Sequence, residues 1–281
     1  MDAGFPTVTL PGGEAVPALG QGTWNVGDSR ATRREEIATI RLGLDLGLTL
    51  VDTAEMYGDG RAEELVGEAL AGRRDEAFVV TKVYPHNASR AGTAAACERS
   101  LRRLRTDRID LYLLHWRGTI PLAETVEGFE ALRRAGKVRH WGVSNLDLAD
   151  MHELWAIAGG RHVAANQLLY NLSHRGIEWD LMPWLRRHHV AVMAYSPIDQ
   201  ARLLRHRKLG AMAERVGRTP AQLALAWVLS QPGVIAIPKT SHRERMRENA
   251  AVLSRPLTKA EAEELGRLFA PPSGPAPLQM I

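Results

Sequence analysis

Eight apolar runs of strand length alternate with segments of helical spacing, and this alternation limits the possible folds more than any other feature. Most of the runs are nearly continuous in Val, Ile, Leu and Ala, as is typical of parallel strands that are covered on both faces. The runs are Gly20–Trp24, Leu48–Thr53, Ala77–Lys82, Ile109–His115, His140–Asn145, Val163–Gln167, Val190–Ser196 and Val234–Lys239. A β-hairpin is predicted before them, from Thr7–Leu10 and Val16–Leu19 around a Pro-Gly-Gly turn.

The segments between the runs carry the start signals of helices. Thr32-Arg-Arg-Glu35 and Thr258-Lys-Ala-Glu261 have the pattern of capping boxes, and Thr219 stands before a proline at the first helical position. Strands that alternate with helices imply right-handed βαβ units. Eight units close into an α/β (β/α)₈ TIM barrel. An open doubly wound sheet is the competing fold, but Gly20 and Gly22 supply only the first two glycines of its dinucleotide fingerprint.

Composition and charge narrow the function classes. The 281 residues carry a net charge of +4 with acidic residues spread throughout, which favours an Arg-rich solvated surface over nucleic-acid binding. No apolar run reaches the ~20 residues of a membrane span, and no secretory signal is visible, so we expect a cytoplasmic protein. The lone Cys97 rules out a disulfide framework, and His188-His189 lacks a third ligand, so no metal site is predicted. We expect one barrel domain over residues 1–281 and a monomer.

Polar residues end nearly every apolar run, and this pattern locates the candidate site. In a barrel, the carboxyl ends of all strands share one rim, where barrel enzymes place their chemistry. Residues about 30 apart in sequence therefore meet around one mouth. The residues at these exits are Asp52, Lys82, His115, Ser144-Asn145, Asn166-Gln167, Tyr195-Ser196 and Lys239-Thr240.

The residues at the ends of the first three of these runs, Asp52, Lys82 and His115, suggest proton transfer when they are taken together with Tyr57 in the loop after Asp52. A phenol has a pKa of about 10 and donates protons poorly near neutrality. An ammonium group beside it favours the phenolate and lowers that pKa, so Lys82, held by Asp52, is expected to make Tyr57 a better acid. His115 can orient a carbonyl oxygen. Together these groups can give a proton to a carbonyl oxygen that becomes an alkoxide during reduction. The hydride that such a reduction needs must come from another source.

At this point the chain resembles the aldo-keto reductase superfamily. The matching segments follow in order from about Gly20 to Asn249, and the ordered set is far more specific than any one of them. They are Asp52-Thr-Ala-Glu-Met-Tyr57, Lys82, Leu-Leu-His115-Trp, Gly142-Val-Ser-Asn145, Asn166-Gln167, Tyr195-Ser-Pro197, Ile237-Pro-Lys-Thr-Ser241 and Arg245-Met-Arg-Glu248-Asn249.

The resemblance implies NAD(P)H-dependent reduction of aldehydes and ketones, with Tyr57 as general acid, Lys82 and Asp52 tuning it, and His115 orienting the carbonyl. It places the nicotinamide on Ser144, Asn145, Gln167 and Tyr195, and the adenosine 2′-phosphate on Lys239, Thr240, Ser241 and Arg245. The adenine would lie by Glu248 and Asn249, and further cofactor contacts would come from Gly22, Thr23, Trp24, Asp52, Ser196, Pro197 and Ile198. Substrate would lie against Trp24, Tyr57, His115 and Trp116. The cations favour NADPH over NADH.

The short segment after Phe269 predicts an open mouth and broad use of small aldehydes or α-dicarbonyls. The alternative from another class is a non-catalytic NADP(H)-binding regulatory barrel, because fold does not settle function. A pure binding protein would have no use for a tuned phenol, which favours the enzyme.

Overall fold

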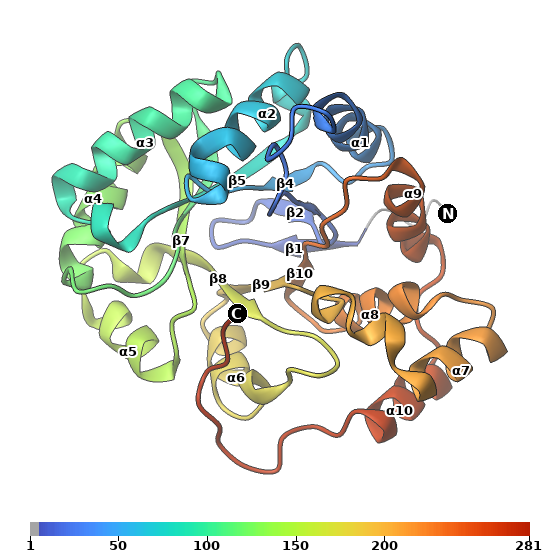
Figure 1. Cartoon of the computed structure of the whole chain (residues 1–281). Helices are drawn as coiled ribbons and strands as arrows, with labels where there is room; N and C mark the ends of the chain where they lie inside the picture. The colour runs from blue at the N-terminus through green and yellow to red at the C-terminus, as the bar shows by residue number, and fades with distance from the viewer. Residues whose placement is uncertain (1–5) are drawn as a thin grey trace.

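The computed structural model describes residues 6–281, in which eight parallel strands form one sheet that curls into a barrel (Figure 1). Neighbouring strands follow the order of the chain from β3 to β10. Parallel bridges from Leu19 to Ala236 and from Gly22 to Lys239 bring the first strand against the last and close the barrel. The strands are β3 (Gln21–Gly22), β4 (Leu50–Asp52), β5 (Phe78–Val83), β6 (Ile109–Leu114), β7 (Val138–Ser144), β8 (Val163–Leu169), β9 (Ala191–Tyr195) and β10 (Val234–Ala236).

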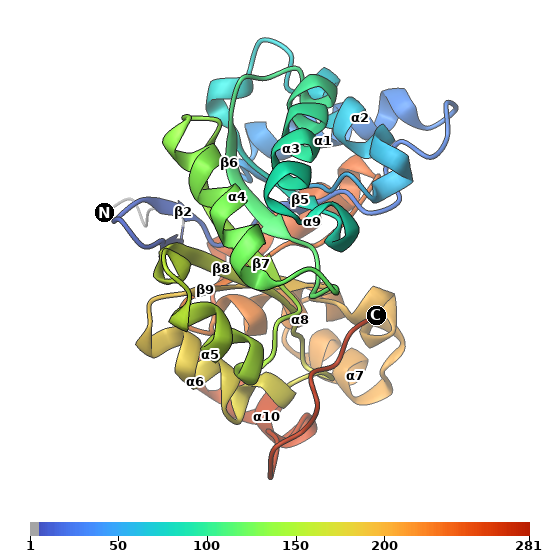
Figure 2. The ribbon, with the colours of Figure 1, turned by 90° about the vertical axis from the view of Figure 1, so that its left-hand side faces the viewer.

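Helices follow the strands and cover the outside of the barrel (Figures 1 and 2). Two of them, α7 and α10, pack against each other beyond this layer, and an ion pair joins Arg215 to Glu264 there. The helices are α1 (Arg33–Asp45), α2 (Arg61–Ala69), α3 (Arg90–Leu104), α4 (Leu122–Arg134), α5 (Leu148–Ala156), α6 (Leu181–Arg187), α7 (Arg207–Arg215), α8 (Pro220–Leu229), α9 (Arg243–Ala251) and α10 (Lys259–Leu268). The predicted (β/α)₈ fold is confirmed.

The capping predictions had mixed outcomes. Thr219 and Thr258 each accept a backbone hydrogen bond at the start of a helix, and each has the reciprocal side-chain bond of a capping box. The capping box at Thr32 is wrong. Its backbone is already helical, with φ −92° and ψ −12°, and its hydroxyl donates to the carbonyl of Ser29 instead of accepting from α1.

The predicted hairpin is confirmed as β1 (Thr7–Thr9) paired antiparallel with β2 (Ala15–Pro17). It closes the end of the barrel at which the parallel strands begin. Its apolar side chains, Val8 and Val16, belong to the same buried cluster as the strand residues Leu50, Leu111 and Met193. Figure 2 shows the hairpin at one end and the C-terminus at the other. The barrel is therefore sealed at one end, which leaves the opposite mouth for chemistry.

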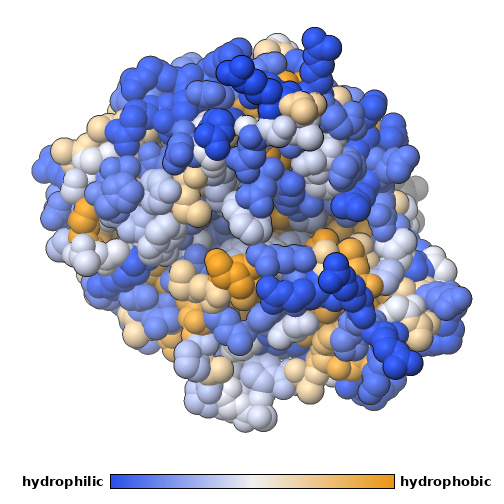
Figure 3. Space-filling view, in the orientation of Figure 1, coloured by the Kyte–Doolittle hydropathy of each residue, from blue (hydrophilic) through white to orange (hydrophobic). Residues whose placement is uncertain are grey.

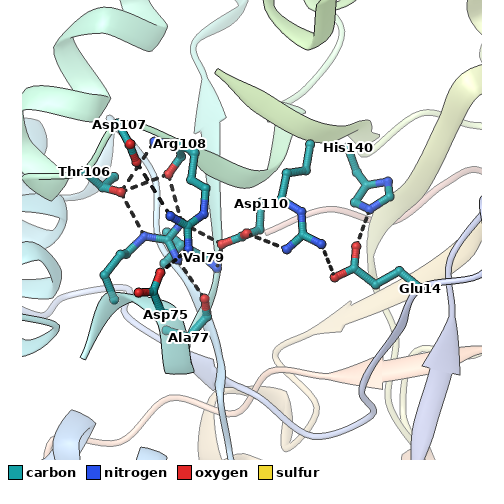
Figure 4. A network of polar contacts seen from close by, with 11 residues as sticks. Glu14, Asp75, Ala77, Val79, Thr106, Asp107, Arg108, Asp110 and His140 are labelled. Carbon is teal, nitrogen blue, oxygen red and sulfur yellow. Dashed lines mark hydrogen bonds and ion pairs between the residues drawn. The ribbon is translucent and has the colours of Figure 1, made fainter. Parts of the chain in front are cut away.

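A polar network holds the hairpin in place (Figure 4). Glu14 accepts a hydrogen bond from Arg139 at 2.7 Å and lies 2.6 Å from the Nε2 atom of His140. The same arginine reaches the buried Asp110 at 3.1 Å, and Asp110 also accepts from Arg74 at 2.7 Å. These groups lie at the amino-terminal ends of the strands, so we assign them to stability. Among the described residues, none of the helices combines the length and apolarity that crossing a membrane requires.

Candidate active site

A fully buried lysine organises the predicted catalytic group. The Nζ atom of Lys82 donates to both carboxylate oxygens of Asp52, at 3.0 and 2.9 Å, and to the carbonyl of Thr53 at 2.7 Å. It also lies 3.3 Å from the hydroxyl of Tyr57. Neither Lys82 nor Asp52 has appreciable exposed surface. The structure thus joins three residues that the sequence separates by up to 30 positions.

The order of the strands explains this meeting. β4 ends at Asp52, and the neighbouring parallel strand β5 presents Lys82 two positions beyond the partner of Asp52 in the register. The chain then turns after β4, where the amide of Tyr57 donates to the carbonyl of Ala54 at 3.1 Å. Gly58 and Asp59 follow with φ values of 58° and 54°. This left-handed turn brings the phenol back over the strand ends.

Burial and charge act in opposite directions on these groups. Burial is the largest single influence on Lys82 and favours its neutral amine, but Asp52 and Tyr57 together outweigh it and raise the pKa of Lys82, so the lysine is a cation. Burial is also the largest influence on Tyr57, and it raises the pKa of this phenol although Lys82 lowers it. Lys82 therefore acts on the pKa of Tyr57 in the predicted direction, but burial, which the sequence analysis did not consider, leaves this pKa above that of an ordinary phenol.

His115 lies beside Tyr57 as a neutral imidazole. It follows β6, and its amide donates to the carbonyl of Val83 at 3.0 Å. Its ring meets the Tyr57 ring edge-on, with centroids 5.8 Å apart. Burial and the charge of Lys82 lower the pKa of His115 to about 2. Its buried Nδ1 atom has no hydrogen-bond partner among the described residues. The imidazole is therefore available for a hydrogen bond without carrying charge.

Three amide and hydroxyl side chains predicted to hold the nicotinamide form a chain next to this group. Gln167 donates from Nε2 to Asp52 at 2.7 Å, and its backbone carbonyl accepts from the Ser144 hydroxyl at 2.8 Å. Asn145 donates to the Ser144 hydroxyl at 3.1 Å and accepts from the hydroxyl of Tyr195 at 2.9 Å. These residues, together with Tyr195, are thus connected to the buried ion pair through the side chain and the backbone of Gln167.

The residues of β3 and its exit lie on the other side of the ion pair. Thr23 donates to the carbonyl of Asp52 at 2.9 Å. A Cβ atom at Gly22 would lie 2.9 Å from the carbonyl oxygen of Ile237, so the closure of the barrel itself requires glycine there. Trp24 is 46% exposed at the rim. Trp116 packs beside His115, with ring centroids 4.9 Å apart.

The residues predicted for the adenosine end lie after β10, away from the ion pair. Lys239 is exposed, and the desolvation of its ammonium group, together with Arg245, lowers its pKa. Ser241 lies 3.4 Å from Glu36. Glu248 accepts a hydrogen bond from Thr219 in the cap of α8. Thr240 and Asn249 are buried, whereas Arg245 is exposed. Lys239 is bridged to Gly22 in the neighbouring strand, which links this region to the mouth.

Sequence reasoning missed several residues at the mouth. The ring of Tyr84 meets Trp116 edge-on at 5.8 Å and lies against His86 at 4.7 Å. β5 continues to Val83, one position beyond the predicted run. Had the strand end been placed correctly, the search for polar residues just after each strand would have found Tyr84. Asn171 was also missed. It donates to the carbonyl of Ser196 at 2.9 Å, a contact with no local sequence signal.

The segment after Phe269, from which an open mouth was predicted, returns toward the barrel, where the Oε1 atom of Gln279 lies 2.8 Å from the Nδ1 atom of His174. The open mouth stays a prediction. Burial raises the pKa of Tyr195, at the end of β9, to about 12. In the view of Figure 1 the C-terminus lies over the β8 and β9 side of the barrel, and Figure 3 shows apolar residues near the middle of the same face. The segment after Phe269 is short, but it is long enough to reach the mouth.

A (β/α)₈ barrel with a phenol, an ammonium group and a neutral imidazole at the carboxyl ends of its strands has the general form of a barrel enzyme with an acid–base site. The family model described as "Aldo/keto reductase family" matches residues 18–269. The chain belongs to this family and is an oxidoreductase.

Its relatives cover almost its whole length. It is 49% identical to "Methylglyoxal reductase YeaE" of Escherichia coli (strain K12) over 279 residues, which are 98% of each protein. A crystal structure of an aldo/keto reductase from Klebsiella pneumoniae in complex with NADP and acetate is 52% identical, has a TM-score of 0.96, and matches over 99% of this chain and 100% of that one. A second structure of an aldo-keto reductase from the same organism, in complex with NADPH, has the same identity and TM-score.

Proposed function

We propose that this chain reduces small aldehydes, ketones or α-dicarbonyls to alcohols with NADPH. The observation that carries the proposal is the contact of 3.3 Å between the Tyr57 hydroxyl and the Lys82 ammonium, which is itself bound by Asp52. The E. coli relative is a methylglyoxal reductase, and the two Klebsiella relatives were solved with NADP or NADPH. These names support the substrate class and the cofactor.

The residues at the mouth fit a dinucleotide. Ser144, Asn145 and Gln167 offer hydroxyl and amide groups to a carboxamide, and the partly exposed ring of Tyr195 offers a flat surface beside them. Lys239 forms no ion pair within residues 6–281, although desolvation disfavours its charge, so a phosphate dianion would relieve this cost. When bound, NADPH would supply the hydride for the carbonyl carbon.

The chain's own residues would supply the proton and the orientation. Tyr57 is protonated at neutral pH, as any phenol with a pKa of about 10 or above is, and it would donate its proton to the carbonyl oxygen. Lys82 would then stabilise the resulting phenolate at 3.3 Å. His115 would donate a hydrogen bond to the same oxygen as a neutral group, which positions the carbonyl without competing for the proton.

The surroundings favour a small substrate. Trp24, Trp116 and Tyr84 offer flat aromatic surfaces near the mouth. Such a pocket would contact an aldehyde or dicarbonyl mainly through apolar surface and would discriminate weakly between similar compounds. A panel of carbonyl compounds tests this, and a single substrate preferred by several orders of magnitude in kcat/KM would contradict it.

The Tyr57→Phe variant tests the catalytic role. It should lower kcat by about 10²–10⁴, because only the proton donor is removed, while the Kd for NADPH stays within about twofold. Tyr112→Phe is the matched control, since Tyr112 is a buried tyrosine on β6 whose hydroxyl has no hydrogen-bond partner in the described part of the chain. If the wild-type protein binds NADPH but oxidises none with any aldehyde, the non-catalytic regulatory barrel becomes the better interpretation.

A further inference from the structure

The C-terminal tail, residues 270–281, has no helix or strand, yet two of its side chains attach it to the rest of the barrel. Leu278 packs against the main apolar core. The Oε1 atom of Gln279 lies 2.8 Å from the Nδ1 atom of His174. A cavity of about 140 Å³ remains beneath the tail, between Pro277 and the segment around Ile177, so the attachments are separate contacts and not one packed interface.

His174 connects the tail to a second loop. Its Nδ1 atom faces Gln279, and its Nε2 atom lies 3.3 Å from the buried carboxylate of Asp199. The backbone of His174 is fixed by Asn171, whose Oδ1 atom accepts from the amide of His174 at 3.1 Å. The same Asn171 side chain donates to the carbonyl of Ser196. The turn after β8 therefore holds the loop after β9 through the hydrogen bond to Ser196, and it places the His174 ring against Asp199, whose buried Oδ1 atom has no other hydrogen-bond partner among the described residues.

The loop after β9, residues 196–201, needs such support. Four of its residues have left-handed backbone angles although none is glycine, with φ values of 49° at Ser196, 51° at Asp199, 48° at Gln200 and 68° at Ala201. Side chains with a Cβ atom avoid this region, and it persists where surrounding contacts determine the conformation. Part of this loop, from Ser196 to Ile198, belongs to the dinucleotide contacts of the proposed function.

We propose that the C-terminal tail is a strap that positions the dinucleotide-binding loop through His174. Gln279 and His174 are then positioning residues: they hold Asp199, and Asp199 holds the strained loop in the conformation that receives the cofactor. The tail would thus set the affinity for the dinucleotide in addition to covering the carbonyl site. This inference rests on the proposed function.

The amide of Gln279 suits this role for a chemical reason. An amide can present either its oxygen or its nitrogen, so Gln279 can accept from or donate to the Nδ1 atom of His174. The connection to Asp199 then needs only a proton on Nε2, which both the neutral tautomer and the charged ring can carry. A glutamine therefore keeps the strap attached in either state.

Binding of NADP⁺ without any carbonyl compound tests the strap. The Kd is measured by titration calorimetry for the wild-type protein, for Gln279→Ala, and for a chain that ends at Pro275. We expect both changes to weaken NADP⁺ binding by about threefold to tenfold, the effect of one lost hydrogen bond. At saturating NADPH, Gln279→Ala should keep kcat within about twofold. Gln231→Ala, which alters a glutamine after α8, is the control and should leave the Kd unchanged.

Two results would overturn the strap while the proposed function stands. One is an unchanged Kd for NADP⁺ together with a raised KM for the carbonyl, which would make the tail a cover only. The other is tighter NADP⁺ binding after truncation, which would make the tail a competitor of the cofactor. A wild-type protein that binds no NADP⁺ would overturn both proposals.

A double-mutant cycle adds a readout that simple destabilisation would not produce. If His174 transmits the effect, the losses in NADP⁺ affinity from Gln279→Ala and Asp199→Asn should be less than additive, because either change alone disconnects the loop from the tail. Additive losses would show that the two residues act independently and would contradict the strap.

Discussion

Replacing Lys82 with methionine should lower the free energy of unfolding at pH 7 by about 3–5 kcal/mol, which is the cost of leaving one partner of a buried ion pair alone. The side chain of Lys82 has no exposed surface, and its Nζ atom donates to both oxygens of Asp52 and to the carbonyl of Thr53. Methionine has a similar volume, so the loss would be electrostatic and not due to a cavity. After the change, only Gln167 would still donate to the Asp52 carboxylate.

The loss should depend on pH in a defined direction. Burial already raises the pKa of Asp52, and Lys82 is the main influence that lowers it, so the pKa rises further in the Lys82→Met variant. A carboxyl group whose pKa is higher in the folded state than the unfolded value of about 3.9 binds more protons when folded. The stability of the variant should therefore fall as the pH rises above about 4, and it should be greater at pH 5 than at pH 7.

The assay is urea unfolding at both pH values, followed by tryptophan fluorescence. Adding Asp52→Asn to Lys82→Met removes the unpaired charge and should recover at least about half of the loss at pH 7. A loss below about 1 kcal/mol in the single variant would refute the reasoning. So would a double variant that is less stable than the single one, because the buried charge would then not be the cause.

Three further predictions concern the cofactor, pH and the hairpin. Lys239→Ala should raise the Kd for NADPH more than the Kd for NADH, and equal changes in a fluorescence titration would contradict a 2′-phosphate role. The kcat/KM for carbonyl reduction should show no ionisation of His115 between pH 5 and 8, since the pKa of His115 is about 2. It should fall only above pH ~10, the ordinary phenol pKa, because the pKa of Tyr57 is raised above that value. A fall on the acidic side that disappears in His115→Gln would contradict this. Glu14→Ala should lower stability by about 1 kcal/mol through its contacts with Arg139 and His140, with an unchanged KM, and a calorimetric Tm equal to that of the wild type would contradict it.

The sequence predicted the barrel well because its evidence is local. Each apolar run is continuous enough to indicate a buried parallel strand, and the runs end at polar residues that the fold must bring to one rim. Lys82 was predicted in this way: an ammonium at the end of an apolar run requires a partner, and Asp52 is held 2.9 Å away. The error at Thr32 has a local cause too, because the pattern of a capping box does not fix the backbone angles of its first residue.

The rest of the mouth depends on contacts between segments that are far apart in the sequence. The spacing of residues along the chain does not predict such contacts. Gln279 meets His174 across 105 positions. Nothing in the residues after Phe269, which are rich in proline, indicates that they return to the turn after β8. The four left-handed residues of the loop after β9 include no glycine, so the usual signal for that backbone region is absent as well.

The raised pKa of Tyr57 clarifies which state of the reaction the buried ion pair would serve. A phenol is protonated at neutral pH without help, and burial favours this neutral form further. The same burial would make the phenolate costly once the proton has left. Lys82 lies 3.3 Å from that oxygen, and Asp52 keeps the lysine charged in a buried position. In the proposed reaction the ammonium would therefore act on the transition state and the phenolate, where its stabilisation lowers the barrier, and far less on the resting phenol.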